Sequence, residues 1–370
     1  MIKVTLANGE TKEFDSQLSA FDAARELGEA KTACAAEIDG KVCDLRTTLT
    51  DGCTVKFLTF EDEQGQRAFN HTASHVLAQA VKRLFPATKL AIGPAIENGF
   101  YYDFDTEEPF TTETLAKIEA EMKKIVKESI RLEHFTMAPD EAIKYLEEQG
   151  EPYKVELCQE HADKGEPISF YKQGDFTDLC AGPHLMSTSP VKAFKLTSVT
   201  GAYWRGSEKN KMLTRIYGIS FPKKSMLDEY IVMMEEAKKR DHRKLGKELE
   251  LFCFSQRVGQ GLPLWLPKGA ALRDRLEQFL RGVQKEYGYQ QVITPHIGNK
   301  ELYVTSGHYA KYGKDSFQPI HTPIEGEEYL LKPMNCPHHC EIYRSKPRSY
   351  KELPVRLAEF GTVYRLSLIH

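Results

Sequence analysis

The stretch HTASHVLAQAVKRLF, which begins at His71, carries the side chains with the clearest chemical potential. His71 and His75 are four residues apart and apolar residues follow at helical spacing, so we predict a helix with both imidazoles on one face. Such a pair could bind a metal ion, relay a proton, or simply pack within a helix. Peptide hydrolysis of the zinc-protease type is disfavoured, because that pattern requires Glu directly after the first histidine and this sequence has Thr72.

A second group of reactive side chains lies much later in the chain, in DLCAGPH at residues 178–184. Cys180 and His184 would complete, with the histidine pair, a donor set suitable for zinc. Two imidazoles, a thiol and the carboxylate of Asp178 could equally bind and activate a water molecule for ester hydrolysis. We favour a functional site, because cysteine and histidine clusters within one domain are rarely without a role. The spacing leaves a metal-bound and a metal-free site open.

The chain that must position these groups is long enough for several domains. It has 370 residues, 41% hydrophobic and 28% charged, so we expect two or three domains with buried cores. A net charge of −3 gives no overall basic field, and any RNA contact must use local patches. Eight scattered cysteines, no signal peptide and no apolar run of membrane-spanning length predict a cytoplasmic protein without a membrane partner.

The first 62 residues read as a small module of their own. IKVTLANGETKEF alternates apolar and polar residues around Asn8-Gly9, which is a strong hairpin signal. A short helix follows and ends at Gly28, and a second turn falls at Asp39-Gly40. The resulting strand–strand–helix–strand–strand order predicts a β-grasp-like module at 1–62.

A second region, 63–224, combines helices with short strands. We expect a polar linker at 61–67, then the helix that carries His71. Residues 112–131 have the periodicity of an amphipathic helix, and a further helix should begin at Pro139 and stop at Gly150. GPAIENGFYYDFD, GAYWRG and LTRIYGISFP read as strands and turns, so this region is an α+β domain.

Residues 225–250 read as one long charged helix, of which 225–244 would link the second region to a third at 245–370. Its second half is rich in basic side chains, namely Lys238, Lys239, Arg240, Arg243, Lys244 and Lys247. We favour a solvated helix between domains over an RNA-binding surface for this run.

HTASHVLAQA together with DLCAGPH resembles the second N-terminal domain of threonyl-tRNA synthetases, which is similar in outline to the editing domains of alanyl-tRNA synthetases. Residues 1–62 resemble the TGS module that begins bacterial threonyl-tRNA synthetases. The resemblance implies an editing site that cleaves serine from mischarged tRNA(Thr). The residues that match its motif are His71, His75, Asp178, Cys180 and His184.

Two more residues enter through the same resemblance. Lys154 in PYKVEL and Tyr102 in FYYDF fall where the family places further editing residues. The family's editing site is usually thought to work without a tightly bound metal. An editing site has a physical purpose, since a methyl group distinguishes threonine from serine by only about 1–3 kcal/mol, which is less than translation requires.

The third region carries motifs of class II synthetases. ALRDRLEQFLRGVQKEYGYQQVITPHI predicts a long amphipathic helix and a strand broken at Pro295, and it resembles motif 1, which lies at the dimer interface. LKPMNCPHH resembles the segment in which Cys336 would bind the active-site zinc and Met334 would line the pocket. LPVRLAEFGTVYR resembles the first strand of motif 2. There Arg365 would hold the ATP α-phosphate with its planar fork, and Glu359 would lie on the same strand.

After Arg365 the sequence reads LSLIH, where the family continues with the rest of motif 2, two histidine zinc ligands and motif 3. We therefore expect an N-terminal fragment that ends inside motif 2. The predicted fold is a multidomain α+β protein with a β-grasp-like TGS module, an α+β editing domain, a linker helix and a partial class II core with an antiparallel sheet.

The family assignment also sets the expected function. It implies a threonine–tRNA ligase that uses Zn²⁺, ATP with Mg²⁺, threonine and tRNA(Thr), works as a homodimer and edits Ser-tRNA(Thr). We expect this chain to lack aminoacylation. The alternatives are a free-standing Ser-tRNA editing hydrolase and a non-enzymatic RNA-binding protein of the TGS type.

Overall fold

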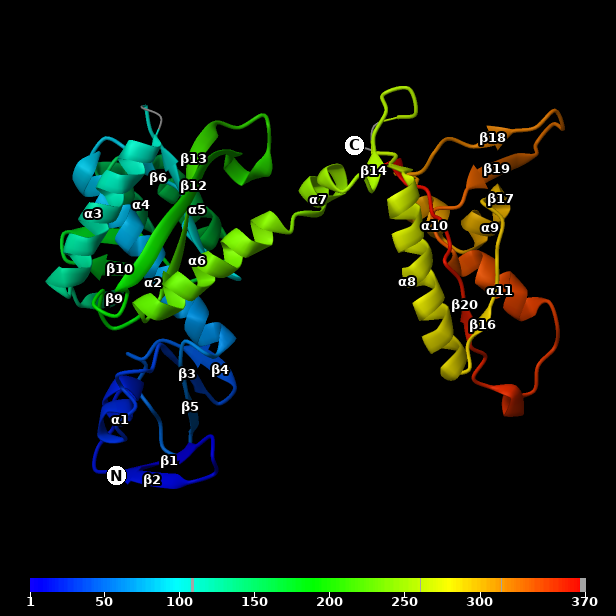
Figure 1. Ribbon diagram of the computed structural model, residues 1–370. Coiled ribbons are helices and arrows are strands. Elements are labelled where there is room, and N and C mark those ends of the chain that lie inside the picture. The colour runs from blue at the N-terminus through cyan, green and yellow to red at the C-terminus, as the bar shows by residue number, and fades with distance from the viewer. Residues whose placement is uncertain (108–109, 260, 314, 367–370) are drawn as a thin grey trace. The chain divides into compact units, whose positions relative to one another are not determined.

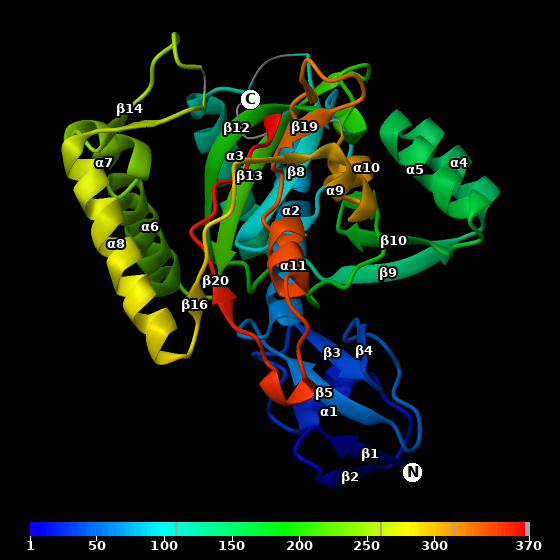
Figure 2. The same ribbon diagram turned by 90° about the vertical axis from the view of Figure 1, so that its right-hand side faces the viewer.

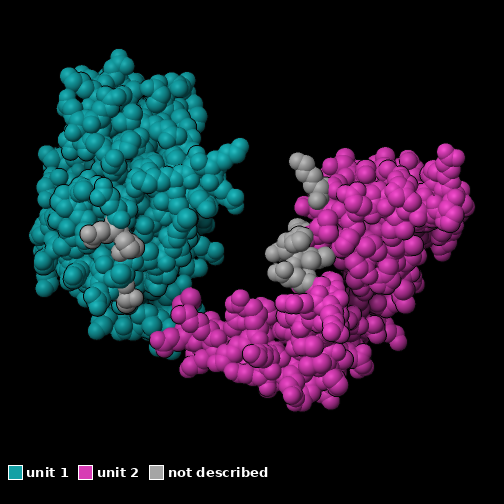
Figure 3. Space-filling model, turned by 90° about the horizontal axis from the view of Figure 1, so that it is seen from above, with its two compact units in different colours: residues 1–233 teal, residues 234–370 magenta. Residues whose placement is uncertain are grey.

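The computed structural model describes residues 1–107, 110–259, 261–313 and 315–366. It divides into two compact units, Met1–Met233 and Met234–His370 (Figure 3). Most of the LSLIH segment, on which the expectation of an early end rests, lies outside the described residues. Within the described part of the chain, no helix is both long and apolar enough to cross a membrane.

Unit 1 begins with a five-stranded sheet in the order β2-β1-β5-β3-β4, in which β1 and β5 are parallel. Its elements are β1 (Ile2–Leu6), β2 (Thr11–Phe14), α1 (Ala20–Glu26), β3 (Ala35–Ile38), β4 (Lys41–Cys43) and β5 (Thr54–Leu58). The hairpins turn at Asn8-Gly9 and Asp39-Gly40 as predicted. Three strands follow the helix, one more than the predicted order allowed. The mixed sheet and its helix bear out the β-grasp-like prediction.

The rest of unit 1 is an α+β assembly with two antiparallel sheets around a central helix (Figures 1 and 2). One sheet has the order β12-β13-β8-β6, with β7 paired to β8, and the other has the order β11-β10-β9. The elements are α2 (Glu63–Leu84), β6 (Lys89–Leu90), β7 (Ala95–Ile96), β8 (Gly99–Asp105), α3 (Thr112–Glu128), β9 (Leu132–Met137), α4 (Pro139–Glu148), α5 (Pro152–Asp163), β10 (Ile168–Gln173), β11 (Phe176–Leu179), β12 (Ala193–Tyr203), η1 (Trp204–Gly206) and β13 (Met212–Phe221).

Helix α2 is the element around which this region is built. Every residue from Ala68 to Val81 is buried except His71, which is half-buried. A helix that is buried on all sides needs small residues at its closest approaches. A Cβ at Gly65 would lie 1.9 Å from the Thr59 carbonyl oxygen, so the turn from β5 into α2 requires glycine there. The polar linker predicted at 61–67 is therefore wrong, because α2 already begins at Glu63.

The charged segment after β13 is two helices rather than the single long helix predicted at 225–250. They are α6 (Lys224–Lys239) and α7 (His242–Glu248). The break follows from local chemistry, since the Asp241 side chain accepts a hydrogen bond from the Arg243 amide and caps α7 at its N-terminus. Asp and Asn favour such caps over helix interiors because their short side chains compete for backbone groups.

Unit 2 combines helices with three small sheets. They pair β14 with β15 and β16 with β20, and in the third sheet β19 pairs with both β17 and β18. The elements are β14 (Phe252–Cys253), β15 (Leu264–Trp265), α8 (Pro267–Glu286), β16 (Gln290–Gln291), β17 (Ile297–Asn299), α9 (Lys300–Thr305), α10 (His308–Tyr312), β18 (Ile320–His321), β19 (Glu328–Leu331), α11 (Cys336–Arg344), η2 (Tyr350–Glu352) and β20 (Leu357–Ala358). The expected long helix is α8. The expected motif 2 strand is reduced to β20, which pairs in parallel with β16.

Candidate functional site

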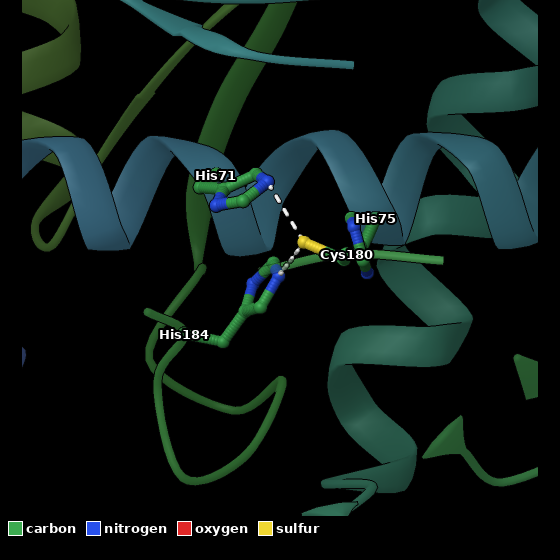
Figure 4. Close-up of side chains that lie close together, drawn as sticks. All are labelled: His71, His75, Cys180 and His184. Atoms are coloured by element: carbon green, nitrogen blue, oxygen red, sulfur yellow. Dashed lines mark hydrogen bonds between the residues drawn. The ribbon is translucent and has the colours of Figure 1, made fainter. Parts of the chain in front are cut away.

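The four residues whose spacing suggested a site do meet in space (Figure 4). His71 and His75 project from neighbouring turns of α2, while Cys180 and His184 lie on the segment after β11. The Cys180 Sγ is 3.3 Å from Nε2 of His71 and 3.2 Å from Nε2 of His184. The rings of His71 and His184 stack with centroids 4.1 Å apart. Residues separated by more than a hundred positions therefore form one compact cluster.

Residues 180–187, here called the site loop, owe their path to glycine and to α2. Gly182 has φ +71°, and a Cβ there would lie 2.3 Å from the Tyr171 hydroxyl oxygen, so no other residue fits. Thr72 Oγ1 donates to the Ala68 carbonyl, accepts from the Leu185 amide at 2.9 Å and lies 3.2 Å from His184 Nδ1. Thr72 thus fixes the loop against α2, a role that its place in the HTASH motif did not suggest.

A buried charge pair lies beside the cluster. Asp178, at the end of β11, is 2.6 Å from the Lys154 ammonium and accepts a hydrogen bond from the Tyr102 hydroxyl at 2.6 Å. His75 Nε2 lies 3.5 Å from the same carboxylate. All four side chains are almost completely buried. The structure therefore brings together all seven residues that the sequence and the resemblance placed in an editing site.

Burial decides the charge state of the cluster. It lowers the pKa of His71 to about 4 and that of His75 to about 3, despite the opposing attraction of Asp178. It also lowers the pKa of His184 well below its ordinary value. The imidazoles are therefore neutral near pH 7, and the same burial makes each a weaker base than free imidazole.

The remaining groups divide into neutral donors and one charge pair. Burial and the nearby Asp178 carboxylate raise the pKa of Cys180 to about 12, so its thiol stays protonated. The same two causes raise the pKa of Tyr102. Burial alone would raise the pKa of Asp178, but the charge of the Lys154 ammonium and the hydrogen bonds from Lys154 and Tyr102 outweigh it, and the pKa is lowered. The site thus holds one ionised carboxylate beside one ammonium among neutral groups.

The members of the site differ in exposure. His71 and Cys180 are half-buried, whereas His75, His184, Asp178 and Lys154 are buried. The His71 imidazole and the Cys180 thiol are therefore the most exposed groups of the cluster. Because that thiol stays protonated, a water molecule activated by an imidazole is a better nucleophile here than the sulfur.

The same four residues could also hold a metal ion. Three imidazoles and one thiol place their donor atoms within 4.8 Å of one another, which suits tetrahedral Zn²⁺. His75 and His184 are backed by the Asp178 carboxylate and by Thr72, as metal-bound histidines usually are. In addition, Nδ1 of His75 is buried without a hydrogen-bond partner. The donor set therefore fits zinc as well as it fits water activation.

The residues predicted for the second site lie in unit 2 and are held differently. Cys336 is exposed at the start of α11. Among the described residues it belongs to no group of three or more close metal-binding side chains, so it does not fit a zinc site by itself. Arg365 donates to the Pro333 carbonyl at 3.3 Å, contacts the Met334 sulfur and lies over the Tyr312 ring at 4.9 Å.

Glu359 is also engaged within the protein. Its carboxylate accepts from the Thr294 amide at 2.7 Å and lies 2.9 Å from His339 Nε2 and 3.7 Å from the Lys332 ammonium. Burial alone would raise the pKa of Glu359, but the contacts with His339 and Thr294 outweigh it and lower the pKa. These contacts give Glu359 a role in holding β20 against the segment around Thr294.

Three family profiles match separate parts of this sequence. They are the TGS domain at residues 2–59, the Threonyl and Alanyl tRNA synthetase second additional domain at 168–217, and the tRNA synthetase class II core domain (G, H, P, S and T) at 321–366. The chain thus combines an editing-type domain with part of a class II aminoacyl-tRNA synthetase core. This confirms the α+β multidomain prediction.

Similar curated proteins narrow the class to one family. The chain is 57% identical to a threonine–tRNA ligase of Bacteroides fragilis over 99% of its length, and 57% identical to one of Parabacteroides distasonis. It is a member of the threonyl-tRNA synthetase family. It covers 57% and 56% of those two relatives, so it spans little more than half their length.

A solved structure of the RNA binding domain of threonyl-tRNA synthetase from Cryptosporidium parvum Iowa II is 44% identical. The match covers 34% of this chain and 31% of that one, with a TM-score of 0.32.

Proposed function

We propose that this chain hydrolyses the ester bond between serine and tRNA(Thr). The observation that carries the proposal is the cluster in unit 1. Neutral imidazoles, a protonated thiol and an ionised carboxylate–ammonium pair lie in direct contact with one another. Such a site offers a proton acceptor to a water molecule and fixed charges to a polar substrate, which is what ester hydrolysis requires.

In the proposed reaction, water attacks the ester carbonyl carbon while the half-buried His71 imidazole accepts a water proton. The bond between the carbonyl carbon and the ribose oxygen then breaks, and the same proton passes to that oxygen. The products are serine and tRNA. The buried Asp178 carboxylate, held by Lys154 and Tyr102, supplies a fixed hydrogen-bond acceptor for the polar groups of the aminoacyl ester.

The activity of the longer relatives is a separate proposal. We propose that the complete protein joins threonine to tRNA(Thr) with ATP and Mg²⁺, uses a zinc site at Cys336, and is a homodimer. The apolar face of α8 supports the dimer, because its large side chains are exposed; they are Leu272, Leu276, Phe279 and Leu280. All eight cysteines are free, which supports a reducing cytoplasmic setting.

We further propose that this 370-residue chain does not itself make Thr-tRNA. Cys336 has no companion metal-binding groups among the described residues, and Arg365 is engaged by the Pro333 carbonyl and the Tyr312 ring. Editing needs none of these groups. We favour this interpretation over a free-standing editing hydrolase, because residues 321–366 match a synthetase core domain that such a protein would not need.

The test is a pair of assays on the purified chain. Deacylation of Ser-tRNA(Thr) at low salt should exceed the spontaneous rate and should fall about 10²–10⁴-fold in His71→Ala, while threonine-dependent ATP–pyrophosphate exchange should stay at background. Arg365→Ala is the matched control and should deacylate like the parent chain. Failure of the parent to deacylate at high enzyme concentration would refute the editing proposal and favour a non-enzymatic RNA-binding role.

A further inference from the structure

The site loop is held on its outer side by the N-terminal module. Asp44 and Arg46 follow β4 and reach across to residues of β9, β10 and the loop. Their side chains are 12% and 17% exposed, so this contact is largely shielded from water. The two parts involved are more than 85 residues apart in sequence, and both lie in unit 1.

Asp44 binds the backbone and the ring that flank His184. Its Oδ2 accepts from the Tyr171 hydroxyl at 2.9 Å and from the His184 amide at 3.3 Å. The ring of Tyr171 in turn meets the His184 ring edge-on with centroids 4.5 Å apart. One carboxylate therefore fixes both the backbone of His184 and the aromatic surface against which its imidazole rests.

Arg46 binds three carbonyl groups at once. Its Nη2 donates to Leu185 at 2.9 Å, its Nη1 to His184 at 3.4 Å and its Nε to Leu132 at 3.0 Å. The same Nη1 also pairs with both oxygens of Asp44, at 2.7 and 2.9 Å. A guanidinium suits this position, because its planar set of donors can serve several acceptors in fixed directions, whereas a lysine ammonium cannot.

We propose that Asp44 and Arg46 are positioning residues of the editing site, through which the N-terminal module fixes the loop that carries Cys180 and His184. The inference rests on the proposed editing function. On the side that faces α2, the site loop is hydrogen-bonded to Thr72. On the side that faces the N-terminal module, it is hydrogen-bonded to Asp44 and Arg46. His184 lies between the two, with its amide and its carbonyl both bound by the module.

The loop has room to move when the pair is removed. A cavity of about 290 Å³ lies on the outer side, lined by Asp44, Arg46, His134, Tyr171, Ala181 and Pro183. Without the pair, the loop can shift into this space, and the Cys180–His184 geometry is lost while α2 and its core stay intact. Misplacement of a catalytic group by about 1 Å can cost 10²-fold in rate, so a large effect on turnover is expected.

The first experiment measures deacylation of Ser-tRNA(Thr) by the full chain. Arg46→Ala and Asp44→Ala should each lower kcat roughly 10- to 100-fold and leave KM within about twofold, since neither side chain belongs to the cluster itself. Arg46→Lys keeps the charge but not the fork and should lie between them and the parent. Arg25→Ala is the control, because Arg25 forms an exposed ion pair with Asp22 on α1 and should change nothing.

The second experiment does not depend on activity. The rate at which iodoacetamide modifies Cys180 in the folded chain is followed by peptide mass spectrometry. It should rise several-fold in Arg46→Ala and Asp44→Ala and stay unchanged in Arg25→Ala, with thermal unfolding confirming that each variant is folded. If the parent chain shows no deacylation, the editing proposal fails and this rate alone decides whether the pair holds the loop.

Two results would overturn the positioning role. One is an unchanged kcat in folded Arg46→Ala and Asp44→Ala, whatever the Cys180 rate. The other is an unchanged Cys180 rate, because the loop then keeps its place without the pair, and any loss of kcat has another cause.

Discussion

The two units treat their candidate site residues in opposite ways. In unit 1 the side chains bind one another: Asp178 alone contacts Lys154, Tyr102 and His75. In unit 2 Cys336 is exposed, and Arg365 is bound to backbone and to an aromatic ring. Side chains that hydrogen-bond to one another already form a site within unit 1. The candidate residues of unit 2 are held by other structural contacts and would need further residues to form one.

The long helices α2 and α8 show the same contrast. Every residue of α2 from Ala68 to Val81 is buried except His71, so of the two imidazoles only that of His75 is fully buried. On α8 the only buried residue is Gly269, and Phe279 is 67% exposed. Both helices have apolar residues at helical spacing. The apolar spacing alone therefore predicts that one face of each helix will be buried, and does not predict which segment or partner buries it.

The largest effect should come from breaking the cluster in unit 1. Cys180→Ala and His71→Ala should each lower Ser-tRNA(Thr) deacylation about 10²–10⁴-fold, the usual contribution of positioned acid–base groups. Both variants should unfold cooperatively, because neither side chain is part of the apolar core. Cys336→Ala in unit 2 is the matched thiol control and should keep full deacylation. Equal losses of deacylation in all three variants would contradict the placement of the editing site in unit 1.

A second large effect concerns stability. Asp178→Asn removes the charge that balances the buried Lys154 ammonium 2.6 Å away, and such a change typically costs about 3–5 kcal/mol in the free energy of unfolding. Glu359→Gln in unit 2 is the comparison. Its lysine partner is 3.7 Å away and still bonds to Thr294 at 2.7 Å, so the loss should be smaller. Urea unfolding at pH 7 compares the two. A loss for Glu359→Gln that matched or exceeded that for Asp178→Asn would contradict this ranking.

A third difference between the units is the pH dependence of thiol modification. Burial, with a smaller contribution from Asp62, raises the pKa of Cys34 to about 12. Cys253, Cys336 and Cys340 of unit 2 are exposed. At pH 8 almost all of the Cys34 sulfur is protonated, and its reactive fraction grows as the pH rises toward 12.

The lower thiolate fraction outweighs the greater nucleophilicity of a high-pKa thiolate, so Cys34 should react with iodoacetamide about 10²-fold more slowly than an ordinary thiol at pH 8. Peptide mass spectrometry should find the three unit 2 cysteines modified first. Early modification of Cys34 in folded protein would show that its burial is not maintained in solution.

The sequence was a good guide to local features of unit 1. The i, i+4 spacing put His71 and His75 on one helix face, and the turn signals at Asn8-Gly9 and Asp39-Gly40 were correct, because each depends only on neighbouring residues. The early start of α2 and the break before α7 were missed. The first depends on the close approach of Gly65 to the Thr59 carbonyl, and the second on a single aspartate cap.

Contacts between segments far apart in the chain could not be predicted from local sequence patterns. Lys154 and Tyr102 entered only through the family resemblance, and nothing marked Thr72, Asp44 or Arg46. The Arg46 bond to the Leu185 carbonyl spans 139 positions, and its acceptor is a backbone atom that every residue type possesses. The side chain on one side of such a contact is visible in the sequence, but its backbone partner is not.

The smallest expected effect is that of Cys336 on metal content. The neighbouring donors His338, His339 and Cys340 share helix α11 with Cys336, and His339 is already bound to Glu359 at 2.9 Å. One free thiolate does not make a tetrahedral site, so this chain should hold no zinc there after dialysis against a mild chelator. Cys336→Ala should therefore leave the zinc content unchanged.

Zinc offered to the protein should instead go to the cluster of unit 1, where four donor atoms lie within 4.8 Å. Elemental analysis of the parent chain, Cys336→Ala and Cys180→Ser, each loaded with one equivalent of Zn²⁺ and dialysed in parallel, decides between the two places. Any retained zinc should be lost in Cys180→Ser alone, because serine replaces the only thiol of that donor set. If the parent chain held zinc tightly and Cys336→Ala lost it, the zinc site would lie in unit 2 instead of unit 1. Cys336 would then bind the metal together with ligands from outside α11.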